Sequence, residues 1–477
     1  MAEILDIDPS KAGARIEGDG ADSWLKEARE LMKLAGPLVI TQLAQMVVMT
    51  TDIVMLGRYS EVALAGAGLG NTVFFLCWLL GTGPAAAVSP MVAHIVGAHP
   101  NNRAQVRGVV RMGLWSVLLL WLPLAGLLLC TQPLLLLFGQ RPELALAASQ
   151  FVLPLCLGLP FTLGFQVLRN FSTALNRPNT SLIVMGLTVL FNLFGTYTLI
   201  FGHFGAPRLG LTGAGIASAC SYAFSFFAMV GVVYATPALR VFRIFRRFHR
   251  VDWGKLKELF RLGIPIGLTM IFEAMLFNAT MLIMGTFGTE YVAAHQIALN
   301  VASITFMVPL GIAMAATVRV GLAAGAGDSA AVRRAGYTAM TVGAVCMFVF
   351  AIVIALFAHT IANFYFASST TSTKTIALVV SFLYLAAAFQ VFDGLQVVGA
   401  LTLRGLKDAR APMWIAGLCY WVAGFPVCYL LGVTFDMKGT GIWIGLAFAL
   451  LVAAAAMTTR FYFLTRPRAG LTMVNAA

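Results

Sequence analysis

Hydrophobic residues occur along the chain in twelve long stretches that are separated by short polar connections. Each stretch holds about 20 or more mostly apolar residues, the length that an α-helix needs to cross the hydrocarbon core of a bilayer. The alternation of apolar and polar residues that marks the strands of a membrane β-barrel is absent. The pattern predicts an all-α polytopic membrane protein with twelve transmembrane helices at 35–57, 64–93, 108–131, 146–171, 180–202, 211–235, 261–286, 293–323, 336–362, 376–403, 411–432 and 440–464.

The first 34 residues differ from the rest of the chain. Residues 1–21 are polar and Gly-rich, with too little apolar surface to pack, and we expect a disordered tail without a cleaved signal peptide. From Asp22 to Lys33, apolar residues recur at helical spacing opposite charged ones, which predicts a short helix on the inner leaflet. At the other end of the chain, 465–477 is expected to be a second tail.

Basic residues are distributed unevenly between the connections. The net charge is +13, and 27 of the 32 Lys and Arg residues fall in alternate connections that we assign to the cytoplasm, with five on the other side. Because positive residues stay inside, this asymmetry places both termini in the cytoplasm. It also explains the basic character of the chain without nucleic acid.

The two halves of the chain resemble each other. The segment that begins at Pro37 aligns with the segment that begins at Pro265, at a shift of 228 residues, and LTGAGIA from Leu211 aligns with MKGTGIW from Met437. Duplicated halves of six spans predict two pseudo-symmetric lobes, 35–235 and 261–464, with a substrate site between them near the bilayer midplane. Repeated architecture favours transport, although receptors can also arise by duplication.

The connection between the predicted lobes, 236–260, is the most basic in the chain. Phe242, Phe245 and Phe248 recur there at every third position among eight nearby Lys and Arg residues from 240 to 261. This pattern is typical of an amphipathic helix on anionic membrane lipid. We therefore predict a cytoplasmic inter-lobe linker that forms a surface helix.

Three acidic residues lie well inside predicted spans: Asp52, Glu273 and Asp393. The predicted topology places no Lys or Arg at the same depth to neutralise them. An unpaired carboxylate in the hydrocarbon is costly, about 2.5–3.5 kcal/mol on insertion scales, so it must hold a proton or bind a cation. We predict that these acids bind the coupling ion. The alternative is a buried carboxyl with a structural role.

Neutral polar side chains accompany these acids on the same helical faces. Such stripes are typical of a polar cavity, and equally of hydrogen bonds between helices. The candidate cavity residues are Gln45, Asn192, Thr196, Thr269, Asn278, Phe389, Gln390 and Gln396. Thirty-five Phe and 21 Met residues favour a broad cavity for organic cations.

Motifs of other function classes are absent. The chain has no GxxxxGK[ST] phosphate loop, no nucleophile elbow and no HExxH, so we expect no nucleotide, no cofactor and no enzymatic activity. Three alternatives remain, one of which is a structural or receptor protein that moves no substrate under an ion gradient. A flippase for lipid-linked oligosaccharides would need a basic cavity, whereas the buried charges predicted here are acidic. An intramembrane enzyme would use Glu273 and Asp393 as a catalytic pair.

Four segments resemble a known family. TTDIVMLG (50–57), FGAPRLGLTGAGIAS (204–218), the stretch from Phe272 to Asn300 and FDGLQVVGALTLRGLKDAR (392–410) are similar to the multidrug and toxic compound extrusion (MATE) family, in its NorM-like branch. The resemblance covers the chain from about residue 24. It implies two six-helix lobes in a bacterial inner membrane that export cationic amphiphiles in exchange for Na⁺ or H⁺, and a monomer is expected.

The resemblance also implies roles for single residues. Glu273 and Asp393 match the cation-site acids of the C-terminal lobe, with Na⁺ as a candidate ligand, and Asp52 matches the acid of the N-terminal lobe. Asn192 matches the first Asn of a motif in the N-terminal lobe. At the position of the second Asn of that motif, this chain has Thr196. NorM-like proteins can carry a Tyr where this chain has Phe389, so one hydroxyl ligand for Na⁺ is missing.

Overall fold

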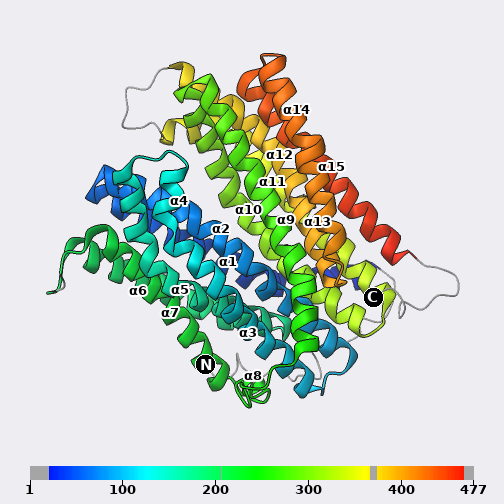
Figure 1. Ribbon diagram of the computed structural model, residues 1–477. Helices are drawn as coiled ribbons and strands as arrows, with labels where there is room; N and C mark the ends of the chain where they lie inside the picture. Colours follow the sequence, from blue (N-terminus) through cyan, green and yellow to red (C-terminus); the bar gives the residue numbers. More distant parts are fainter. Residues whose placement is uncertain (1–20, 206, 366–372, 467–477) are drawn as a thin grey trace. The chain divides into compact units, whose positions relative to one another are not determined.

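The computed structural model describes residues 21–205, 207–365 and 373–466. The predicted N-terminal tail, apart from Ala21, and nearly all of the C-terminal tail lie outside these residues. The described residues form the helices α1 (Ala21–Tyr59), α2 (Glu61–Ala98), α3 (Arg103–Leu129), α4 (Thr131–Leu137), α5 (Pro142–Ala174), α6 (Asn179–Phe201), α7 (Gly210–Ala235), α8 (Pro237–Arg240), α9 (Trp253–Phe287), α10 (Thr289–Gly325), α11 (Ser329–Tyr365), α12 (Thr373–Gly405), α13 (Arg410–Gly417), α14 (Phe425–Tyr429) and α15 (Lys438–Thr465). Figure 1 traces them in chain order.

Twelve candidate membrane spans occur within the described residues, and each contains or overlaps one of the predicted stretches. The prediction of an all-helical polytopic protein is therefore confirmed. The helices are longer than predicted because their polar ends continue the helix beyond the apolar stretch; α9, for example, begins at Trp253 rather than at residue 261. The eleventh span combines α13 and α14 with two π-helical segments, Leu418–Gly424 and Leu430–Thr434.

The predicted short helix at Asp22–Lys33 is not a separate element. It forms the first part of α1, which continues through Pro37 to Tyr59. Leu31, Leu34 and Leu38 are buried in a core with residues of α10 and α12. Trp24, Leu25 and Met32 on the apolar side of Asp22–Lys33 are nevertheless exposed, so the placement of this segment on the membrane surface stays a prediction.

The chain divides into two compact units. Unit 1 contains residues 40–267, and unit 2 contains 21–39 and 268–466 of the described residues. The divisions fall inside α1 and α9, after Val39 and Gly267, whereas the lobe boundaries of the prediction were placed between helices.

Corresponding helices pack in the same way inside each unit. In unit 1, α2 packs against α5 and α3, and α5 packs against α7; in unit 2, α10 packs against α12 and α11, and α12 packs against α15. Glycines allow the closest contacts. A Cβ at Gly70 of α2 would lie 2.9 Å from the carbonyl oxygen of Ala148 on α5, so the backbones meet there.

The basic connection after α7 is not a surface helix. After the four residues of α8 it forms turns, with positive φ at Arg243 (46°) and Arg247 (58°). Phe242 is 7% exposed, with its ring 5.5 Å from that of Phe171, and Phe248 stacks on Trp115. The predicted amphipathic helix is therefore wrong, because the phenylalanines pack into unit 1.

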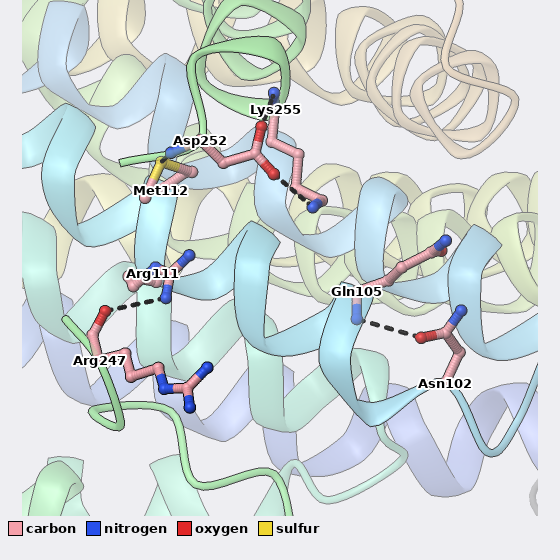
Figure 2. A network of polar contacts seen from close by, with 7 residues as sticks. All are labelled: Asn102, Gln105, Arg111, Met112, Arg247, Asp252 and Lys255. Atoms are coloured by element: carbon pink, nitrogen blue, oxygen red, sulfur yellow. Dashed lines mark hydrogen bonds and ion pairs between the residues drawn. The ribbon is translucent and has the colours of Figure 1, made fainter. Parts of the chain in front are cut away.

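Side chains of α3 hold this connection through its backbone carbonyls. Arg107 Nε donates to the carbonyl of Phe242 at 2.8 Å, and Trp115 Nε1 donates to that of Phe248 at 2.9 Å. Figure 2 shows the third contact, from Arg111 Nη1 to the carbonyl of Arg247 at 3.0 Å. These bonds take up backbone groups that a helix would have paired internally.

Candidate functional site

Asp52 lies at the centre of a polar cluster in unit 1. It projects from α1, and its Oδ1 accepts hydrogen bonds from Thr196 Oγ1 at 3.1 Å and Asn192 Nδ2 at 3.4 Å, both on α6. Its Oδ2 accepts a shorter bond from Ser218 Oγ on α7, at 2.6 Å. The polar stripe of α6 thus meets the acid of α1. Ser218 was not predicted, although Ser218, Ser221 and Ser225 recur at helical spacing along α7 and are all buried.

Glu273 and Asp393 lie together in unit 2. Glu273, on α9, is half-buried, and Asp393, on α12, is 5% exposed. The two carboxyl groups interact electrostatically. Two acids that come together in an apolar surrounding repel each other when both are charged, so the pair favours a bound proton or cation.

A basic side chain also faces this pair. Arg404, at the end of α12, is 8% exposed and interacts electrostatically with Glu273. The predicted topology did not place a basic residue within electrostatic range of Glu273, and Arg404 is such a residue. The prediction that all buried charges are acidic is wrong, because Arg169 and Arg334 are 6% and 4% exposed. The predicted span 376–403 ends directly before Arg404, which assigned this charge to the membrane surface.

Several buried polar atoms beside these acids have no hydrogen-bond partner among the residues that the structure describes. Buried polar groups are normally satisfied, so such a concentration indicates a place where water or a ligand binds. The group comprises Asp393 Oδ1, both side-chain polar atoms of Gln390, Gln396 Oε1, Tyr420 Oη, Trp443 Nε1 and both ring nitrogens of His295.

Aromatic contacts connect these polar groups. The Phe389 ring lies 5.5 Å from the Trp443 ring, which lies 5.4 Å from the His295 ring. Tyr420, which interacts electrostatically with both Glu273 and Asp393, comes from the first π-helical segment. Insertions of this kind often occur at functional sites. Tyr420 was not predicted, and no local pattern in the sequence indicates a π-helix.

The other predicted cavity residues are placed differently. Gln45 is half-exposed and accepts a bond from Arg169 in unit 1, at 3.1 Å. Asn278 is exposed and donates to the carbonyl of Ala274 on its own helix, at 2.7 Å. Thr269 is 2% exposed. Of the predicted residues in unit 2, Gln390, Gln396 and Phe389 join the acids in the cluster above, whereas Asn278 does not.

Comparison with known proteins identifies the family. A family model described as MatE matches residues 37–198 and again 265–430. The chain belongs to the MatE family. The starts of the two matches are separated by 228 residues, the same shift that was found between the halves of the sequence.

Relatives of the same family match nearly the whole chain. A probable multidrug resistance protein NorM of Mesorhizobium japonicum is 41% identical over 94% of this chain and 96% of the relative. A probable multidrug resistance protein NorM of Brucella suis is 38% identical over 92% of this chain and 94% of the relative. The NorM-like resemblance is confirmed, and the MatE chain is a transporter rather than an enzyme.

Solved structures support the same fold. A crystal structure of a eukaryotic MATE transporter matches with a TM-score of 0.80 and 23% identity over 92% of this chain and 96% of that chain. A crystal structure of a MATE in the bent conformation matches with a TM-score of 0.83 and 19% identity over 95% and 97%. The twelve-span prediction thus corresponds to the MATE fold.

Proposed function

We propose that this protein is a secondary antiporter that exports cationic amphiphilic compounds in exchange for inward Na⁺ or H⁺. Its relatives are described as probable multidrug resistance proteins, and the chain shares their length and family. The proposed location is a bacterial inner membrane, with both termini in the cytoplasm, because basic residues concentrate in alternate connections.

One observation carries this proposal. In unit 2, Glu273 and Asp393 lie together among buried oxygen and nitrogen atoms that have no hydrogen-bond partner in the described part of the chain. A proton on either acid would remove the repulsion between them. A Na⁺ ion would do the same, with carboxylate oxygens and the Oε1 atoms of Gln390 and Gln396 as candidate ligands. We therefore assign ion coupling to this pair.

Asp52 is proposed to receive cationic substrate groups in unit 1. Its carboxyl accepts three hydrogen bonds that fix its orientation, and Gln45 lies two helical turns earlier on the same helix. Alternating binding and release of the ion would favour opposite access states, as in other transporters built from repeats.

The test measures ethidium movement in liposomes that contain the purified protein. Na⁺ and H⁺ gradients are imposed separately, and the parent is compared with Asp393→Asn. The matched control is Glu290→Gln, which removes an acid from an exposed position at the start of α10. We expect gradient-driven flux in the parent and the control, and its loss in Asp393→Asn. If the folded parent moves no dye under either gradient, the proposal fails.

Orientation needs a separate measurement. In intact cells, a membrane-impermeant maleimide should label a cysteine introduced at Glu143, before the fourth span, but not one introduced at Arg246. Both positions are exposed. If only the cysteine introduced at position 246 is labelled, the orientation in the membrane is the opposite of the one proposed.

A further inference from the structure

An arginine without a carboxylate partner lies inside unit 1. Arg169, on α5, is 6% exposed, and its Nη1 donates to Gln42 Oε1 at 2.9 Å and Gln45 Oε1 at 3.1 Å. Within the part of the chain that the structure describes, no acidic side chain pairs with it. Both partners are neutral amides. Burying an uncompensated charge is costly, so the site favours a negative group.

Two hydrogen-bond donors at this place are unused. Among the described residues, neither the buried Arg169 Nε nor the hydroxyl of Thr173, which is 1% exposed, has a hydrogen-bond partner. Thr173 follows Arg169 by four residues on the same helix, so the two side chains are neighbours on one face. Buried donors rarely remain unsatisfied. A water molecule would satisfy the hydrogen bonds, but only an anion would also balance the charge of the guanidinium.

The geometry of α1 relates this place to the proposed substrate acid. Gln42 and Gln45 are half-exposed, so they form the open side of the arginine site. Asp52 lies seven residues after Gln45 on the same helix, about 10 Å along its axis. Unit 1 therefore presents the buried basic group of α5 and the half-buried acidic group of Asp52 at two levels along α1.

We propose that Arg169 and Thr173 form a binding site for a monovalent anionic group, the carboxylate of a substrate that carries both charges. The inference rests on the proposed function, in which Asp52 receives the cationic part. The same chemistry would accept a free inorganic anion such as chloride. A transporter with this site would export zwitterionic compounds as well as simple cations.

A matched pair of dyes tests the site. One is the methyl ester of a rhodamine, a cation; the other is the same rhodamine with a free carboxylate, a zwitterion. Binding to the full-length protein in detergent is followed by fluorescence polarisation. In Arg169→Gln, we expect the affinity ratio of zwitterion to cation to fall about tenfold, the loss typical of a charge-assisted hydrogen bond. Arg169→Lys should retain part of the preference.

The control variant is Arg103→Gln, which removes an exposed positive charge from α3 of the same unit and should leave the ratio unchanged. To distinguish a free anion from a substrate carboxylate, the melting temperature is measured over a series of chloride concentrations. Sulfate replaces chloride so that the ionic strength stays constant. If chloride raises the melting temperature of the parent but not of Arg169→Gln, the free anion is a ligand. If only the affinity ratio of the two dyes changes, the carboxylate of the substrate is the ligand.

Two results would overturn the inference. One is an unchanged dye ratio together with no chloride effect, which would leave Arg169 as a clamp between α5 and α1. The other is an equal loss of affinity for both dyes in Arg169→Gln, together with no effect of chloride on the melting temperature of the parent. If the parent binds neither dye, the proposed function is in doubt, and the chloride series still decides whether the anion site exists.

Discussion

The ion pair between Glu27 and Arg319 offers a quantitative test of how α1 is anchored in unit 2. Glu27 is 3% exposed and Arg319 is 18% exposed. Arg319 Nε donates to Glu27 Oε1 at 2.8 Å, and Nη2 donates to Oε2 at 2.6 Å, so the contact is bidentate. We predict that Glu27→Gln strongly destabilises the packing of α1 against α10.

The expected magnitude follows from burial. Removing one partner of a buried pair leaves an uncompensated charge and costs about 3–5 kcal/mol. Because Arg319 keeps some exposure, we expect the lower end, about 3 kcal/mol. Replacing both partners by apolar residues, as in Glu27→Leu with Arg319→Met, should cost much less than Glu27→Gln alone, because no charge then remains buried.

The same helix provides a matched control. Glu30 and Lys33 form an ion pair at exposures of 44% and 57%, and exposed pairs contribute less than about 1 kcal/mol. Unfolding by SDS in mixed micelles, followed by circular dichroism, measures both pairs under one condition. If Glu27→Gln costs no more than Glu30→Gln, or if the apolar double variant is as unstable as the single one, the reasoning is refuted.

Three further predictions concern unit 1. A Cβ at Gly83 would lie 2.2 Å from the carbonyl oxygen of Gly263, so Gly83→Ala should cost about 1–3 kcal/mol by forcing α2 and α9 apart, measured as a lower melting temperature. Ser218→Ala removes the 2.6 Å donor to Asp52 and should slow dye flux in liposomes about tenfold. Asp252→Asn should speed amide hydrogen exchange in the first turn of α9 at neutral pH.

The predicted effect of Asp252→Asn on hydrogen exchange depends on pH. Lys255 donates to the Asp252 carboxylate from its side chain and its backbone, which holds the pKa of Asp252 below its usual range. The stabilisation is therefore present above the usual aspartate range and is lost as the pH falls through the lowered pKa. The amide exchange rates of the parent and of Asp252→Asn in the first turn of α9 should converge only in that acidic pH range. A difference in rate that stays constant with pH would contradict the reasoning.

Controls separate the other two effects from general damage. Gly126→Ala, on α3, places a Cβ with no atom within 4 Å and should leave the melting temperature unchanged. Ser218→Thr keeps a hydroxyl and should retain more flux than Ser218→Ala. Equal melting temperatures for the two glycine variants, or equal flux for the two serine variants, would contradict these predictions.

The twelve spans were predictable because bilayer thickness requires about 20 apolar residues per helix, a signal that each stretch carries by itself. Part of the Asp52 cluster was predictable for a similar reason, since Asn192 and Thr196 are four residues apart on one helix. Ser218 depends on how α7 packs against α6, and the sequence alone does not contain that distance.

The errors share a physical cause. Glu27, Arg404 and the phenylalanines of the basic connection were assigned to surfaces because charged and amphipathic segments at span ends usually lie there. In the structure they are enclosed by side chains from distant parts of the chain, such as Arg319 for Glu27 and Trp115 for Phe248. Charge patterns show which segments leave the hydrocarbon, but tertiary contacts decide which of them are buried.

The two acidic sites differ in how completely the protein satisfies them. Asp52 has both carboxyl oxygens occupied by donors from α6 and α7. Asp393 has an oxygen without a partner, beside two glutamines in the same condition. A carboxyl group whose two oxygens already accept hydrogen bonds gains less from binding an ion than one with an unused oxygen. We therefore expect that ion coupling depends mainly on Glu273 and Asp393, and that the ordered carboxyl of Asp52 contributes more to recognition of the substrate.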